Sequence, residues 1–198
     1  MLLASNSLTP IAKPVETSEA EPLSDLVAGC QQRKQGSRDA QRQLYELCHR
    51  RVYRLVVRMV GRQEAADVIQ QVFLQVFRAI DRFDGRSRFE TWLYRVTMNE
   101  ALQHLRRQRR WHWTPLVSDL VDCEPNQERH LDYKELLEYA LARLAPELRS
   151  LFLLREVEKQ SYAEIAEVSQ IPEGTVASRL NRARQLLKQH LLELGWEQ

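Results

Sequence analysis

Apolar residues recur at helical spacing through most of this chain, and this periodicity limits the folds that it can adopt. No strand-like alternation persists over residues 23–110, where glycine is also sparse. One segment, residues 64–80, places its apolar side chains on one helical face, at Val68, Ile69, Val72, Phe73, Val76, Phe77 and Ile80. A glycine-containing loop at 81–88 interrupts the pattern, and a further helix is predicted from about Phe89 to Gln108. The sequence therefore predicts an all-α fold.

Composition divides the chain into two helical parts. Residues 1–22 contain prolines and glutamates without apolar periodicity, which predicts a disordered N-terminal tail. Between residues 113 and 128 there are several acids and two prolines but no lysine or arginine, which is typical of a linker. We expect two small helical domains, 23–112 and 131–198, joined by a flexible acidic linker at 113–130.

Charge and cysteine usage exclude several classes of protein. The formal net charge is only +2, so total charge does not indicate nucleic-acid binding, although arginine is locally concentrated. The three cysteines, Cys30, Cys48 and Cys123, lie far apart and form no zinc-binding pattern or disulfide framework. No apolar run reaches the ~18 residues of a membrane span, and the N-terminus lacks signal-peptide order. We expect a cytoplasmic protein without metal, cofactor or membrane insertion.

Two short helices are predicted to adjoin near the C-terminus. Ser161 and Glu164 have the spacing of a capping box, which starts a helix. Pro172 favours the start of a second helix directly afterwards. Gln170 stands in the turn where glycine is common, so it is expected to adopt a left-handed backbone. This arrangement is a helix-turn-helix.

The second helix of this pair has one apolar and one polar face. Its apolar stripe is formed by Val176, Leu180, Ala183 and Leu187. Side chains that can read base edges or flank them lie on the other faces, at Ser178, Arg179, Asn181, Arg182 and Gln185. The helix begins near Gly174 and Thr175, whose backbone N–H groups suit a phosphate. The alternative interpretation is an ordinary amphipathic surface helix with a basic face.

A second polar stripe follows the helix that begins at Phe89. It consists of an indole, amides and guanidinium groups at Trp92, Arg95, Asn99, Gln103, Arg106 and Arg110. Aromatic faces stack on bases and arginines hold the backbone, so the stripe is typical of a platform for single-stranded nucleic acid. The preceding loop adds Phe83, Arg86 and Ser87, beside which a base displaced from a duplex could bind. Alternatively, Trp92 belongs to the core and the arginines are merely solvated.

The order of these parts resembles the extracytoplasmic-function (ECF) class of bacterial RNA polymerase sigma factors, over roughly residues 23–192. The segment Ala65–Phe77 is similar to the helix by which this family grips core polymerase. Phe83–Asn99 is similar to its promoter-melting segment. Tyr162–Ala166 and Gly174–Arg184 are similar to its helix-turn-helix. The resemblance implies a non-catalytic subunit that directs promoter-specific transcription initiation.

The resemblance also implies roles for the residues named above. The Phe89 stripe and the loop before it would melt the −10 element, and the helix-turn-helix would read the −35 element. Core polymerase would contact Asp67, Gln70, Gln71 and Phe73, although Phe73 equally fits the core. The family usually has Gln-Glu-Thr-Phe where this chain has Gln70-Gln-Val-Phe73, so one acid is lost. Expected partners are core RNA polymerase, promoter DNA and an anti-sigma factor.

Two other functions remain open from the sequence. A stand-alone helix-turn-helix regulator would bind duplex DNA without polymerase, and its N-terminal domain would serve dimerisation or ligand sensing. The single-strand stripe argues against this alternative. A nuclease would need clustered carboxylates to hold metal ions, whereas the acids lie mostly in the linker and on exposed helical faces. We therefore expect neither catalysis nor a small-molecule substrate.

Overall fold

The computed structural model describes residues 20–32, 37–111 and 133–196. Within these ranges every regular element is helical, as the periodicity predicted. The elements are α1 (Ala20–Gln31), α2 (Ser37–Val60), α3 (Arg62–Ala79), the 3-10 turn η1 (Ile80–Arg82), α4 (Phe89–Trp111), α5 (Tyr133–Ala142), α6 (Pro146–Glu156), α7 (Tyr162–Ser169) and α8 (Glu173–Glu193).

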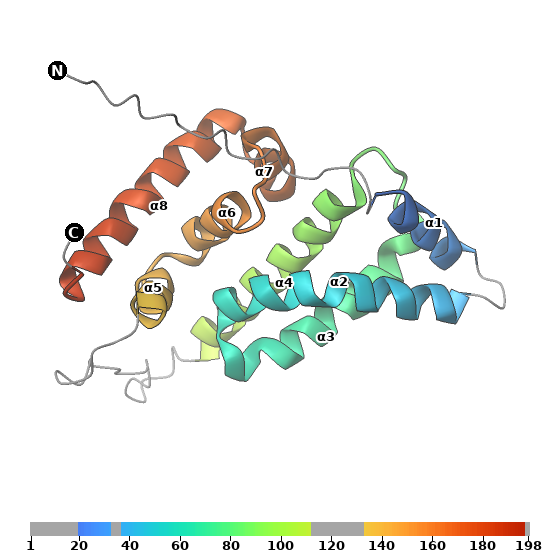
Figure 1. Ribbon diagram of the computed structural model, residues 1–198, viewed down its shortest axis with the longest axis horizontal. Helices are drawn as coiled ribbons and strands as arrows, with labels where there is room; N and C mark the ends of the chain where they lie inside the picture. The colour runs from blue at the N-terminus through green and yellow to red at the C-terminus, as the bar shows by residue number, and fades with distance from the viewer. Residues whose placement is uncertain (1–19, 33–36, 112–132, 197–198) are drawn as a thin grey trace, which may run out of the picture.

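Helices α1 to α4 form an N-terminal lobe in which α2, α3 and α4 pack on one another and α1 lies across α2 (Figure 1). The apolar faces predicted from the sequence meet in its centre, where Leu55, Met59 and Leu93 are almost fully buried. Burial of such side chains is the main favourable contribution to folding. This core fixes α3 and α4, the two helices that carry predicted site residues.

Helices α5 to α8 form a C-terminal lobe around Leu153, Leu154 and Leu180. Pro146 is the first residue of α6, where its missing N–H is not needed. The predicted capping box is present at the start of α7. There the Ser161 hydroxyl accepts from the Glu164 N–H at 3.2 Å and the Glu164 carboxylate accepts from the Ser161 N–H at 2.8 Å. Local sequence thus sets both helix starts.

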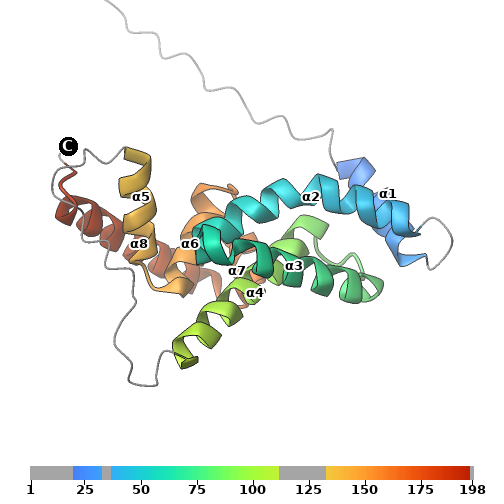
Figure 2. The same ribbon diagram turned by 90° about the horizontal axis from the view of Figure 1, so that it is seen from below.

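The two lobes are docked on each other, with α4 against α6 and α7, and α2 against α5 and α6 (Figures 1 and 2). Glu158, in the turn between α6 and α7, lies in this junction with a side chain only 3% exposed. Its carboxylate accepts from Arg54 at 2.9 Å and from the Tyr94 hydroxyl at 2.7 Å, while Arg51 lies 3.9 Å away. We call these four residues the Glu158 clasp. A buried carboxylate needs such partners to offset its desolvation.

Arg149 of α6 makes a second contact across the junction. Its guanidinium donates to the Met59 carbonyl at the end of α2 at 2.7 Å, and also to the carbonyls of Ala142 and Leu144. Carbonyls at a helix C-terminus lack intrahelical partners and attract a cation. Burial, followed by the nearby charge of Arg109, lowers the pKa of Arg149.

Helix α1 begins slightly before the predicted end of the N-terminal tail. The tail was expected to extend to residue 22, but α1 already begins at Ala20. Pro22 falls in the first turn of this helix, a position where proline is tolerated. The remainder of that tail, residues 1–19, and the whole predicted linker, 113–130, lie outside the described residues.

Candidate nucleic-acid interface

Helix α8 separates its two faces as the sequence predicted. Its apolar stripe is buried, with Val176, Leu180 and Ala183 at 0% exposure. The exposed side chains include Ser178, Arg179, Asn181, Arg182 and Gln185. Gly174 is exposed and Thr175 half-buried at the helix start, where the Thr175 carbonyl accepts from the Ser178 hydroxyl at 3.0 Å. The polar face of α8 is therefore free to meet a ligand.

Helix α7 supports α8 from the lobe side, through the buried Ile165 and Val168. Gln170 ends α7 in the left-handed conformation, with φ 54° and ψ 43°, as expected for this turn position. Arg184 bonds Glu156 of α6 at 2.8 Å, and the hydrogen bonds to Glu156 and Tyr162 raise the pKa of its guanidinium. The helix-turn-helix is thus fixed by both apolar and ionic contacts, and α8 lies along the outer side of the lobe (Figure 1).

The stripe on α4 is only partly a surface. Trp92 was expected at its start, but the indole is buried, 8% exposed, between Phe83 and Phe89 with ring centroids 5.5 Å from each. An apolar ring beside two others gains more from burial than from water contact, so the core alternative describes Trp92 in this structure. Asn99, Gln103 and Arg106 are exposed and Arg95 is half-buried. Arg106 also pairs across the junction with Glu147 of α6, at 3.6 Å.

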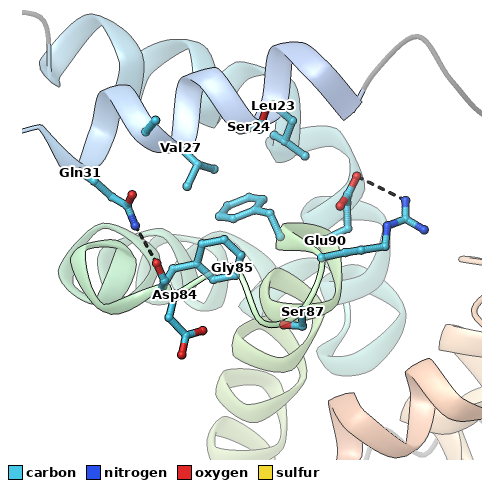
Figure 3. Close-up of a pocket in the computed structure, with 12 residues that line it drawn as sticks. Leu23, Ser24, Val27, Gln31, Asp84, Gly85, Ser87 and Glu90 are labelled. Atoms are coloured by element: carbon cyan, nitrogen blue, oxygen red, sulfur yellow. Dashed lines mark hydrogen bonds and ion pairs between the residues drawn. The ribbon is translucent and has the colours of Figure 1, made fainter.

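The loop before α4 forms one side of a groove of about 500 Å³ (Figure 3). Its other side is α1, through Leu23, Val27 and Gln31. Phe83 and Ser87 are half-buried in the groove wall, while Arg86 is exposed. This volume is within the ~300–1,000 Å³ range of small-ligand pockets.

The loop takes its shape from two local features. Gly85 has φ 72°, a conformation that a residue with a β-carbon adopts only with strain. The Asp84 carboxylate accepts from the Arg86 N–H at 3.2 Å and pairs with its guanidinium at 2.9 Å. These contacts form a compact polar tip next to the aromatic residues.

The residues predicted to bind polymerase separate into two groups. Asp67, Gln70 and Gln71 are exposed on α3, where they line a polar groove of about 450 Å³ with Glu100, His104 and Arg107 of α4. Phe73 is 5% exposed, with its ring 4.5 Å from that of Tyr45, so it belongs to the core. The sequence had left both roles open for Phe73.

Two residues of structural importance were missed from the sequence. Gln31 contacts the backbone at the start of the loop, and Glu158 joins the lobes. Neither has a sequence signal, because a single glutamine or glutamate in a helical protein is most often a solvated surface residue. Gln31 is 52 residues from its partner Phe83 in the sequence, and Glu158 is 104 residues from its partner Arg54. Only the tertiary structure therefore identifies these contacts.

The described part of the chain contains neither a metal-binding cluster nor a membrane-spanning helix. No cluster of three histidines, cysteines or carboxylates there could hold a metal ion. In the same residues no helix has the length and apolar character to cross a bilayer. Cys30 and Cys48 are buried free thiols, and burial raises the pKa of both.

Comparisons with known proteins agree with this arrangement. The profile of Sigma-70 region 2 matches residues 44–111, and that of Sigma-70 region 4 matches residues 134–187. The ECF RNA polymerase sigma-E factor of Haemophilus influenzae is 31% identical over 191 residues, covering 88% of this chain and 99% of that protein. The sigma-E factor of Escherichia coli K12 is 35% identical over 153 residues, covering 69% of this chain and 78% of that protein.

Solved structures show the same fold. A sigma factor RpoE from Bartonella quintana, in complex with the anti-sigma factor NepR, superposes with a TM-score of 0.63 at 24% identity, covering 76% of this chain and 95% of that one. CnrH, in complex with the cytosolic domain of CnrY, also gives 0.63, at 21% identity, covering 88% of this chain and 99% of that one.

A helical lobe matching region 2 and a helix-turn-helix lobe matching region 4 define a sigma-70-type protein. Identity of 31% over almost the whole length of an ECF relative narrows this class. The chain belongs to the ECF RNA polymerase sigma factors, and it is a sigma factor of transcription initiation. The family and the fold expected from the sequence are confirmed.

Proposed function

We propose that the chain binds core RNA polymerase through the exposed face of α3 and then engages two promoter elements with its two lobes. Asp67, Gln70 and Gln71 make the polymerase contact, and Phe73 supports them from the core. The polar groove beside them contains a negative charge at Glu100 and a positive charge at Arg107, and so suits a partner helix that carries charges of both signs. As a specificity subunit the chain has no catalytic activity of its own.

In this proposal the C-terminal lobe reads the −35 element as duplex. Asn181, Arg182 and Gln185 face base edges in the major groove, with Ser178 and Arg179 toward the backbone or neighbouring bases. Gly174 and Thr175 present the helix N-terminus to a phosphate. The observation that carries the proposal is the exposure of the polar side chains from Ser178 to Gln185 on the face opposite a buried apolar stripe.

The N-terminal lobe opens the −10 element. The groove between α1 and the 83–88 loop receives a displaced base, with Phe83 in its wall and Arg86 and Ser87 at the loop. Asn99, Gln103 and Arg106 follow along α4 and hold the single strand, and Arg95 flanks them. Because the ring of Trp92 is buried, its role in this proposal is to pack against Phe83 and hold it in place.

Regulation by an anti-sigma factor belongs to the same proposal. The structural neighbour RpoE of Bartonella quintana was solved with such a partner. A partner that covers the α3 face would prevent polymerase binding without touching DNA. The chain would act in the cytoplasm, where polymerase and promoter are found.

Transcription in vitro from a library of genomic fragments tests the proposal. The purified chain is assayed with core polymerase, core polymerase alone serving as the control. Transcripts that require both components, and that share two spaced upstream elements, are expected. The proposal fails if no such transcripts form while the chain alone shifts specific duplex fragments, because that outcome identifies a stand-alone regulator.

A further inference from the structure

Gln31 ties α1 to the backbone that leads into the promoter-melting loop. Its side-chain amide nitrogen donates two hydrogen bonds, to the Ile80 carbonyl at 2.9 Å and to the Phe83 carbonyl at 2.8 Å, and Figure 3 draws the second of these. The Ile80 carbonyl also accepts from the Phe83 N–H at 3.0 Å, which closes η1. One amide therefore holds both ends of the turn from which the loop starts.

The geometry separates this contact from the general docking of α1. Helix α1 is already anchored by Leu23, Val27 and Cys30, which are at most 6% exposed. Gln31 is half-buried and adds directional bonds to an anchored helix. Loss of its donors would leave α1 in place and would release the carbonyls of η1.

The position of Phe83 depends on these carbonyls. Its ring meets Phe89 edge-on, with centroids 5.6 Å apart, and lies 5.5 Å from Trp92. Beyond Phe83, at Asp84 to Arg86, the loop is exposed and is held by its own local bonds. A shift at the start of the loop would therefore move the whole tip.

We propose that Gln31 is a positioning residue for promoter melting, which holds the 83–88 loop ready to capture a base displaced from the duplex. The inference rests on the proposed function. Opening a base pair is costly, and a loop that is already in place offsets that cost without further ordering. Gln31 lines the groove that receives the base, but in this role it acts through the backbone of Ile80 and Phe83.

Open-complex formation by the holoenzyme tests this role. The full chain with core polymerase is mixed with a promoter from the transcription assay that carries a fluorescent base analogue in its −10 element. Gln31→Leu removes both donors at similar size. Gln32→Leu is the matched control, because Gln32 is the next residue along the chain and its side chain is exposed. A second template has the −10 element already opened by mismatches.

Gln31→Leu is expected to slow opening of the duplex promoter about tenfold, the factor that about 1.4 kcal/mol produces. On the mismatched template the loss should shrink below about twofold, since no base pair has to be opened there. Gln32→Leu should match the wild type on both templates, and affinity for core polymerase should not change for either variant.

Two outcomes would overturn the inference. One is a wild-type opening rate for Gln31→Leu on duplex DNA, and the other is an equal loss on both templates, which would indicate a general folding defect. Gln31→Met, a second donor-free variant, replaces Gln31→Leu if the latter lowers the melting temperature. A wild-type chain that gives no polymerase-dependent transcripts would instead refute the proposed function itself.

Discussion

At Gln170 a single residue carries the turn of the helix-turn-helix in a conformation that suits glycine. Its φ of 54° lies in the left-handed region, where a β-carbon meets the following carbonyl oxygen. Its N–H still bonds the Ala166 carbonyl, so the turn is complete in spite of the strain. The sequence allowed this prediction because capping box, turn and Pro172 are close together in the chain.

Gln170→Gly is expected to raise the free energy of unfolding by about 0.5–1 kcal/mol, because relief of the strain exceeds the extra chain entropy that glycine loses. Urea denaturation followed by circular dichroism measures this change. Gln170→Ala is the control, since it removes the same side chain and keeps the β-carbon. A gain of stability in the alanine variant as large as in the glycine variant would contradict the explanation.

The buried thiol of Cys48 leads to a prediction about how stability depends on pH. Burial raises its pKa from 9.0 to about 11, with a nearby Glu90 adding to the rise and Arg51 opposing it. Because the pKa of Cys48 is higher in the folded state than in the unfolded state, the protonated thiol contributes to the free energy of unfolding. This contribution is fully present well below pH 9 and is lost as the pH rises toward 11. Between roughly pH 7.5 and 10.5 the loss from this thiol should be about 2 kcal/mol.

Cys48→Ala should lose less stability over this alkaline range than the wild type, by the same amount. Urea midpoints at roughly pH 7.5 and 10.5 give the comparison, and any cavity created by the substitution cancels because it is present at both pH values. A constant difference between the two proteins at both pH values would show that Cys48 does not titrate in this way.

At the scale of elements, the helices could be predicted from the sequence and their contacts across the lobes could not. The faces of α8 followed from spacing alone, because four buried positions at helical intervals leave the rest to solvent. Trp92 could not be placed in the same way, since its burial depends on Phe83, which belongs to the loop before α4. The contacts of Gln31 and Glu158 join segments distant in sequence, which periodicity does not reveal.

Helix α8 gives the prediction at this scale. Asn181→Ala should lower transcription from a promoter with an intact −35 element roughly tenfold, because a well-placed amide contributes about 1–3 kcal/mol of base discrimination. In vitro transcription with saturating core polymerase measures it. Gln189→Ala is the control, two turns further along the same helix and bonded to Glu193 at 2.9 Å. Equal losses in both variants would indicate damage to the helix instead of lost recognition.

At the scale of the whole molecule, docking of the lobes decides which surfaces are available. Arg106, which we assign to the single strand, pairs with Glu147 of the opposite lobe at 3.6 Å. Arg88 at the end of the loop lies 3.6 Å from Glu164 of α7. The docked arrangement therefore occupies part of the proposed −10 surface, while the α3 face stays exposed.

Glu158→Ala should favour separation of the lobes. The Tyr94 hydroxyl would lose a charged acceptor, a bond worth about 1.5–3 kcal/mol, and the half-exposed arginines add less. Docking should weaken roughly tenfold to a hundredfold, seen as a larger radius of gyration in small-angle X-ray scattering. Glu156→Ala is the control, since Glu156 pairs with Arg184 inside its own lobe. An unchanged radius for Glu158→Ala would mean that the clasp does not hold the lobes together.

The charges of the Glu158 clasp would also affect the rate at which separated lobes dock again. In the separated state, α2 would present Arg51 and Arg54 without Glu158, and the other lobe would present Glu158 without these two arginines. Opposite charges attract over a Debye length of about 10 Å in 0.1 M salt. Electrostatic attraction would therefore accelerate docking of the lobes, and the docking rate would fall as ionic strength rises. The lifetime of the open state would therefore increase with ionic strength.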